Sequence, residues 1–340
     1  MFPNLMLPYL EKLTKVDFSK LKEFHDSEEL SDIFNAYDYI YKFIEEPFNN
    51  DVISTNEQSL FNASVFLVNK ISNFKCYMSQ FKAINPCYVF YSLGILAKKF
   101  ETFKTARFSF EKLSNLQYPP KWSEKIDKEI MNIRTKPYID KDTQIPTCYN
   151  CLHTNPIINV SGDFCSNCAY PFIRCALSFE ILPLIEFKPA KGISYDQAMD
   201  FIRLSTIEKL KKNIVSKNQD SNGVHSLKVY MGDNDQNIFE NKLLDLINEQ
   251  ESTDTYKMLE LDETVLKSLN ENEVFIIDQR NINSHFPVRF FKNRKKEIGV
   301  TMCKFCFRFF KLEEFENAFI KVGNCCPLCK NVDESMKGFN

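Results

Sequence analysis

The sequence predicts a mainly α-helical protein with a small α+β part, in which a tetratricopeptide-like α-solenoid is followed by two zinc-ribbon-like modules. Three observations lead to this fold class. Up to about residue 136, apolar residues recur at spacings of three and four, as in amphipathic helices. After Pro137, short β-prone stretches alternate with polar, proline-containing segments. Eight of the twelve cysteines form four Cys-x-x-Cys pairs, which is the spacing of metal ligands.

Helices are expected around Ile33 to Ile44, around Leu60 to Ile71 and over Trp122 to Arg134. In the last of these segments three isoleucines share one side, which predicts its buried face. The members of this set are Ile126, Ile130 and Ile133.

The segment "NPCYVFYSLGILAKKFETFKTARFSFEKLSNLQYPP" predicts a pair of helices close to the 34-residue tetratricopeptide pattern. Gly94 and Ala106 are small where paired helices must approach, and Phe90 and Phe110 fill the space alongside. Ala97 departs from the pattern, which has a large aromatic residue there. The segment is therefore one degenerate repeat, and a generic helical bundle is the alternative.

Beyond the helices, the chain is expected to divide into three further parts. The β-prone stretches are "FIRCALSF", "ILPLIEF", "EVFII" and "FPVRFF", and Ser194 with Gln197 forms a capping-box signature before a helix. Residues 213–236 are polar and predict a flexible stretch, followed by a helix that carries Phe239 and Leu243. The predicted parts are a helical domain at 1–138, a first zinc-ribbon module with a following strand and helix at 139–202, an insertion at 203–261 and a second zinc-binding module at 262–340.

The first cysteine set lies in "CYNCLHTNPIINVSGDFCSNC" and predicts a zinc ribbon, because two tight Cys-x-x-Cys turns supply four soft ligands at tetrahedral angles. The stretch between the pairs suggests a hairpin that turns at Ser161 and Gly162 and brings the two turns face to face. The predicted ligands are Cys148, Cys151, Cys165 and Cys168.

The second cysteine set has 19 residues between its pairs, and its predicted ligands are Cys303, Cys306, Cys326 and Cys329. Cys325 competes with Cys326, but the spacing to Cys329 and the following Pro327 favour Cys326. Four thiolates at each site leave no open coordination position, so we expect two structural zinc ions. A redox dithiol would need a βαβ context and no matching second pair, and disulfides are not expected in a reducing compartment.

Composition excludes several classes of protein. The longest nearly unbroken apolar run, 87–97, is shorter than the roughly 20 residues that span a bilayer, and the first residues do not resemble a secretory signal, so we expect a cytosolic protein without a transmembrane segment. The net charge is −2 and each four-thiolate zinc site would make it more negative, which argues against nucleic acid as the main partner. The motifs H-E-x-x-H, G-x-S-x-G, G-x-G-x-x-G and G-x-x-x-x-G-K-[ST] are absent, so no enzyme and no catalytic residue is expected. An enzyme whose Ser-His-Asp residues meet only in the folded chain is the remaining alternative.

Some residues have competing interpretations. His153 is expected at the surface and not as a ligand, and Cys76, Cys87 and Cys175 are expected to be small buried residues. The basic run "FKNRKK" at 291–296 either contacts phosphate or is a solvated loop. The phenylalanines between 305 and 319 exceed what a small zinc module can bury, so some are expected to contact the rest of this chain or another protein.

Four segments resemble, in order, the C-terminal region of members of the intraflagellar transport protein 122 family. Members of this family are subunits of intraflagellar transport complex A. The four segments begin at "PCYVFYSLGILAKKF", "CYNCLHTNPIINV", "FEILPLIEFKPAKG" and "CKFCFRFFKLEEF", and residues 203–261 do not match well. The eight cysteines fall where the family has zinc ligands. The resemblance implies a tetratricopeptide-like solenoid with terminal zinc modules. The family's propellers are not in this sequence.

The resemblance further implies a non-enzymatic scaffold that binds other subunits of complex A. Such a scaffold would support complex assembly, retrograde ciliary transport with dynein and the ciliary entry of membrane-protein cargo. It would be found at the cilium, the basal body, the cytoplasm and the cytoskeleton. The alternative from another class is a zinc-ribbon module that binds nucleic acid or acts in the ubiquitin pathway.

Overall fold

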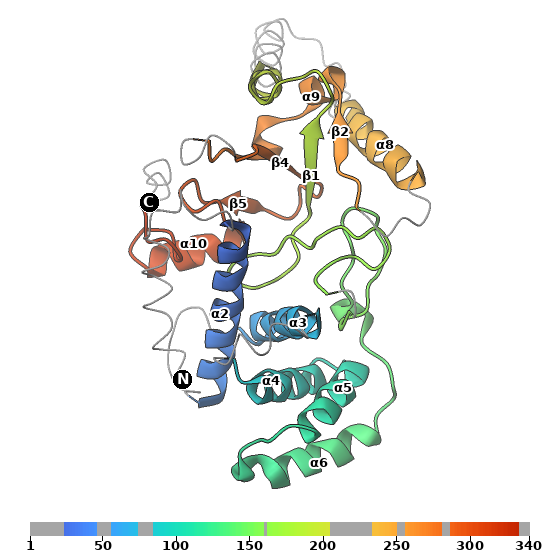
Figure 1. Ribbon diagram of the computed structural model, residues 1–340, viewed down its shortest axis with the longest axis vertical. Coiled ribbons are helices and arrows are strands. Elements are labelled where there is room, and N and C mark those ends of the chain that lie inside the picture. The colour runs from blue at the N-terminus through green and yellow to red at the C-terminus, as the bar shows by residue number, and fades with distance from the viewer. Residues whose placement is uncertain are drawn as a thin grey trace, which may run out of the picture.

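The computed structural model describes residues 24–45, 56–73, 84–159, 162–204, 233–249, 256–280 and 286–332. Within these ranges it is a mixed helix and sheet structure (Figure 1). Helices occupy one end, a small sheet with its helices occupies the other, and the chain from 140 to 183 runs between them (Figure 1). No helix in the described ranges has the length and apolarity needed to cross a bilayer.

The helical end contains α2 (Phe24–Glu45), α3 (Glu57–Asn73), α4 (Pro86–Lys99), α5 (Phe103–Ser114) and α6 (Ser123–Arg134). Helices are therefore present at each of the segments expected to be helical. α4 begins at Pro86, which fits the first helical turn, and the Asn85 side chain accepts from the Cys87 amide at 3.0 Å. Ile126 and Ile133 of α6 are buried and Ile130 is partly buried against the same core.

Helices α4 and α5 approach each other closely at Gly94. A Cβ atom at Gly94 would lie 2.8 Å from the Phe110 ring, so no larger residue fits there without movement of that ring. Phe110 is 1% exposed and Ala106 is fully buried. The expectation that Gly94 is small because two helices approach is confirmed. The core continues into the cysteine-rich part, since Ile157 and Phe179 belong to the same cluster of buried side chains.

The sheet has the strand order β2-β1-β4-β3 and joins segments far apart in the chain. β1 (Leu184–Pro189) pairs in parallel with β2 (Leu259–Leu261) and antiparallel with β4 (Arg289–Asn293), which in turn pairs antiparallel with β3 (Val274–Ile277). One face packs against α8 (Asp233–Glu249) and α9 (Glu263–Ser268), where Phe239, Leu243 and Leu266 are fully buried.

A second, two-stranded sheet lies in the C-terminal part. It pairs β5 (Val300–Met302) with β6 (Phe309–Lys311) and is followed by α10 (Leu312–Lys321). Phe309, Phe310, Phe315 and Phe319 are buried in a cluster with residues 175–184, and Phe305 stays 52% exposed. The expectation that some of these rings contact the rest of the chain is confirmed.

Two local expectations are corrected. The stretch "FIRCALSF" forms no strand: the Cys175 amide donates to the Glu180 carbonyl at 2.8 Å, which closes a tight turn. The expected hairpin at 157–164 forms no strand among its described residues. Asn69 of α3 takes the backbone groups that a hairpin would pair, since it donates to the Ile157 carbonyl and accepts from the Asn159 amide.

The remaining local expectations concern 194–236. The capping box is confirmed, because the Ser194 amide donates to the Gln197 side chain at 3.0 Å and the Gln197 amide donates to the Ser194 hydroxyl at 3.2 Å. Most of the stretch expected to be flexible lies outside the described residues, and its end, from Asp233, is the start of α8. Cys76 also lies outside them.

Candidate metal centres

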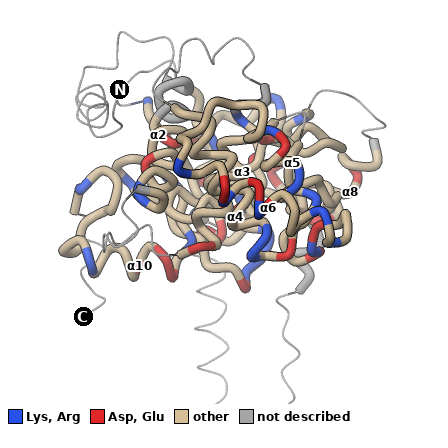
Figure 2. The backbone as a smooth tube through the Cα atoms, turned by 90° about the horizontal axis from the view of Figure 1, so that it is seen from below, with Lys and Arg blue, Asp and Glu red and all other residues tan. Residues whose placement is uncertain are grey.

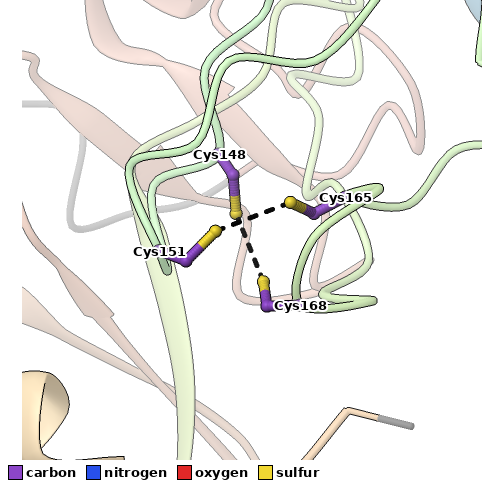
Figure 3. Close-up of side chains that lie close together, drawn as sticks. All are labelled: Cys148, Cys151, Cys165 and Cys168. Carbon is purple, nitrogen blue, oxygen red and sulfur yellow. Dashed lines mark hydrogen bonds between the residues drawn. The ribbon is translucent and has the colours of Figure 1, made fainter. Parts of the chain in front are cut away.

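The four cysteines of the first set lie together, with their sulfurs directed toward one another (Figure 3). Cys148 and Cys151 come from one turn, and Cys165 and Cys168 come from a second turn that faces it (Figure 3). Three of the four residues are buried, and Cys151 is partly buried. The face-to-face arrangement of two turns agrees with the one expected from the sequence.

The second set lies together in the same way, and its members are Cys303, Cys306, Cys326 and Cys329. The structure shows which of the adjacent residues Cys325 and Cys326 belongs to the second set. Cys326 is in the cluster and is 2% exposed, whereas the Cys325 thiol donates to the Val322 carbonyl at 3.4 Å. Cys325 is therefore a neighbour of the cluster and not one of its four sulfurs.

The sulfur spacing tests whether zinc fits. Sulfurs at the corners of a tetrahedron around zinc, with Zn–S bonds of about 2.3 Å, lie about 3.8 Å apart. Cys148 and Cys168 are 3.7 Å apart and Cys151 and Cys165 are 3.6 Å apart. In the second set the corresponding separations are 3.8 and 3.9 Å. All of the sulfurs within a set lie within 4.8 Å of one another, so both sets fit a structural zinc ion.

A repeated backbone turn places each pair of sulfurs. The amide of the first cysteine donates to the carbonyl five residues on, as from Cys148 to His153 at 2.9 Å and from Cys326 to Asn331 at 2.9 Å. The amide four residues on returns to the carbonyl of that cysteine. The residue four positions after the first cysteine has a positive φ of 54–60° in each turn, which closes the turn tightly. These residues are Leu152, Ala169, Phe307 and Lys330.

Asparagine side chains hold the two turns of the first cluster together, a role that no local sequence pattern indicates. Asn155 follows the first turn, and its carbonyl oxygen accepts from the Ser166 amide at 2.7 Å in the second turn. Asn167 and Asn150 also donate to cluster sulfurs, at 3.6 Å to Cys151 and 3.5 Å to Cys168. Donors directed at sulfur stabilise thiolates, so these contacts favour the metal-bound form.

The directions of the thiol pKa shifts indicate why a cation would be needed to keep all four sulfurs of a cluster ionised. Hydrogen bonding to neighbouring cysteines, chiefly Cys148, lowers the pKa of Cys165. Hydrogen bonding of the same kind, chiefly with Cys151, raises the pKa of Cys148. In the second cluster, hydrogen bonding between Cys303 and Cys306 lowers the pKa of Cys303 and raises that of Cys306. Clustered sulfurs thus ionise at each other's expense until a divalent cation stabilises them all as thiolates.

Other residues singled out in the sequence lie outside the clusters. His153 is exposed and is in neither set of sulfurs. Cys87 and Cys175 are buried, as expected.

The basic run 291–296 is used inside the molecule. Arg294 is 8% exposed, pairs with Glu240 of α8 at 2.6 Å and donates to the carbonyls of Tyr149 and Asn150 in the first cysteine turn. Lys292 is 4% exposed beside Glu273, and burial lowers its pKa. The run therefore holds the first cluster against the sheet. Its last two residues, Lys295 and Lys296, are exposed, which agrees with the expected solvated loop.

The remaining lysines of this run also have partners. Lys296 pairs with Glu273 at 2.8 Å, and Lys295 lies over the Tyr149 ring at 5.5 Å. Basic and acidic residues are interspersed along the described part of the chain in the view from below (Figure 2). This distribution does not favour the nucleic-acid alternative.

Comparison with known proteins gives consistent relatives. Residues 141–185 match the family model described as IFT122, zinc ribbon domain. The intraflagellar transport protein 122 homolog of Danio rerio is 28% identical over 316 residues, which is 93% of this chain and 25% of that protein. The homolog of Mus musculus is 28% identical over 91% of this chain, and that of Homo sapiens is 25% identical over 91%.

The chain spans about a quarter of the length of the curated relatives it matches. The matched zinc ribbon contains the whole first cluster, and the two clusters together fit two structural zinc ions. The resemblance expected from the sequence is thereby confirmed: the chain is similar to intraflagellar transport protein 122 homologues over more than nine tenths of its length and carries a zinc ribbon that matches that family's model.

Proposed function

We propose that this chain is a non-enzymatic scaffold region of an intraflagellar transport complex A subunit, and that it binds other subunits of that complex. The observation that carries the proposal is the pair of closed four-sulfur clusters. With all four positions of each zinc ion taken by sulfur, no position remains for water or a substrate, so the metal fixes geometry.

The eight cysteines of the two clusters are proposed as the zinc ligands. Each zinc site contributes on the order of 10 kcal/mol to local folding, on the scale known for zinc-finger peptides. The first cluster lies between the helical end and the sheet. Metal binding there would hold the two ends of the molecule in one fixed arrangement, as a docking surface requires.

The helical end is proposed to be a tetratricopeptide-like solenoid. The close contact of Gly94 with Phe110 supports this proposal, because small residues at the helix crossing are part of that pattern. The division at 1–138, 139–202, 203–261 and 262–340 remains a prediction. Contacts cross its boundaries: β1 and β2, from two predicted parts, are neighbours in one sheet.

The relatives support a proposed cellular role. The proposed subunit takes part in retrograde ciliary transport and in the entry of membrane proteins into the cilium, with indirect association with dynein and cargo. We propose that it is found at the cilium, the basal body, the cytoplasm and the cytoskeleton. The proposal rests on similarity to the intraflagellar transport protein 122 homologues.

Copurification tests the scaffold role. The full chain is expressed with tagged complex A subunits, and partner recovery is compared for the wild type, Cys148→Ser and Cys326→Ser. Both variants are expected to lose partners, because each removes one sulfur of a cluster. Cys325→Ser is the matched control, since Cys325 lies next to a cluster sulfur without joining the cluster. Unchanged recovery with both cluster variants would contradict a role of zinc in docking.

A further inference from the structure

A fifth turn has the same geometry as the four that carry the cluster sulfurs. In residues 175–180 the Cys175 amide donates to the Glu180 carbonyl at 2.8 Å, and the Phe179 amide returns to the Cys175 carbonyl at 3.0 Å. Phe179 has φ 56°, within the range of the four cluster turns. A β-bridge between Arg174 and Ile181 encloses it, just as Thr147 and Thr154 enclose the first cluster turn. The two ligand positions of this turn carry Cys175 and Ser178.

The side chains at these two positions are buried. Cys175 is fully buried and Ser178 is 3% exposed. In the four cluster turns, the same two positions direct their sulfurs to one point. The Ser178 hydroxyl makes no hydrogen bond of normal geometry with any described residue. Its side chain acts on the Cys175 thiol, where it opposes the increase in pKa caused by burial and by Glu314. A buried hydroxyl that faces a thiol and has no other polar partner among the described residues can serve as a ligand position.

A third donor reaches the same place from α10. The Cys175 thiol donates to the Glu314 carboxylate at 3.3 Å, a contact that zinc would replace by losing the thiol proton. A sulfur and an oxygen that share one tetrahedral zinc ion, with bonds of about 2.3 and 2.0 Å, lie about 3.5 Å apart. The Lys311 amide donates to the Cys175 sulfur at 3.4 Å, as the Asn167 amide does to the Cys165 sulfur in the first cluster. The surroundings of Cys175 thus resemble those of a cluster sulfur.

A cavity of about 180 Å³ adjoins this turn and is lined in part by Cys175 and Phe179. It has room for water, which could complete a cation's coordination. Its three arginines pair with carboxylates: Arg174 with Asp163 at 2.6 Å, Arg289 with Glu186 at 2.6 Å, and Arg308 with Asp32. These ion pairs reduce the positive charge that a cation would meet at the cavity wall.

We propose that Cys175, Ser178 and Glu314 form a third cation site, which takes Zn²⁺ through one thiolate, one carboxylate and one hydroxyl, with a fourth position open to water from the cavity. Its affinity is lower than that of the two four-sulfur clusters, because a hydroxyl is a poor zinc ligand and only one thiolate is present. Zinc at this site would link α10 to the turn at 175–180. α10 lies between the two cysteine pairs of the second cluster, and the turn follows the first cluster in the chain. The site is independent of the proposed subunit role.

Metal stoichiometry tests the site. The purified full chain is equilibrated with a series of buffers of increasing free zinc concentration. The bound zinc per chain is then measured by inductively coupled plasma mass spectrometry. The wild type is expected to hold two ions across the series and to gain a third at higher free zinc. Glu314→Gln and Cys175→Ser are expected to lose only the third ion, and Cys325→Ser is expected to keep all three.

Ser178→Cys supplies a gain of function that does not depend on removing a buried group. It creates a Cys-x-x-Cys turn and is expected to tighten the third ion by about tenfold or more, because a thiolate replaces a hydroxyl. With cobalt as the probe, this variant should also gain sulfur-to-cobalt absorption relative to the wild type. A stoichiometry of two for the wild type over the whole series would overturn the proposal. So would a third ion that survives in both Glu314→Gln and Cys175→Ser, or one that Ser178→Cys does not tighten.

Discussion

The helical end and the cysteine-rich stretch next to it are ordered by different means. α3, α4 and α5 bury Leu67, Leu93 and Phe110 in one continuous apolar core. Among the described residues from 145 to 183, by contrast, no helix or strand forms, and three isolated β-bridges are the regular pairing. A stretch with so few backbone ladders depends on side-chain cross-links. The comparison indicates that apolar burial orders the first region and that metal-held sulfurs order the second.

Removal of the metal should give the largest difference between the two regions. A strong chelator is expected to unfold the cysteine-rich part, residues 141–335, while α3 to α5 keep their structure, because each zinc site supplies on the order of 10 kcal/mol locally. Hydrogen exchange with mass spectrometry should show lost protection in 141–335, including both cysteine clusters, and retained protection in α3 to α5. Far-UV circular dichroism without any change after verified metal loss would refute the comparison.

Arg294→Gln should give the next largest effect, because the cysteine-rich part also depends on buried polar contacts. The substitution leaves Glu240 and the carbonyls of Tyr149 and Asn150 without their cationic partner. We expect a loss of about 2–4 kcal/mol in the free energy of unfolding, somewhat less than for a fully buried ion pair because Glu240 is 25% exposed.

Denaturant titration measures this loss, and Arg294→Lys is the conservative variant, since it keeps the charge without the guanidinium geometry. A loss in Arg294→Gln no greater than that of an exposed lysine substitution would show that these contacts do not hold the first cluster to the sheet.

Gly94→Ala tests the apolar core of the helical end by adding volume, whereas the two preceding changes remove a metal and a cationic side chain. The new Cβ would lie 2.8 Å from the Phe110 ring, and overpacking of this kind costs about 1–3 kcal/mol. We expect a lower melting temperature with unchanged zinc content, because the cysteine clusters are not touched. A second change, Phe110→Leu, should offset part of the loss in a double-mutant cycle. If zinc content falls together with stability, the two regions are not ordered independently.

Reversal of two exposed charges should give the smallest effect. Lys296 is 49% exposed in its pair with Glu273, so Lys295→Glu together with Lys296→Glu should change the free energy of unfolding by about 1 kcal/mol or less. Filter binding with single-stranded RNA and duplex DNA is expected to show no salt-dependent affinity in the wild type. Salt-dependent binding that this double variant abolishes would instead favour the nucleic-acid alternative.

The sequence by itself determined the local features. The Cys-x-x-Cys spacing fixed which sulfurs come in pairs, the apolar spacing gave the helices, and the side chains of Ser194 and Gln197 specified a helix start that the structure contains. Gly94 was correctly interpreted from the pattern around it. Each of these features depends on residues a few positions apart, so the chain encodes it directly.

Only the tertiary structure decided which distant groups meet. It made the run 291–296 an internal brace, brought β2 beside β1, and placed Glu314 against a turn whose second ligand position holds serine and therefore carries no paired-cysteine signal. It also replaced the expected hairpin with contacts to Asn69 of α3. The physical reason is that burial and long-range hydrogen bonding depend on what packs against a segment, and no local pattern states that.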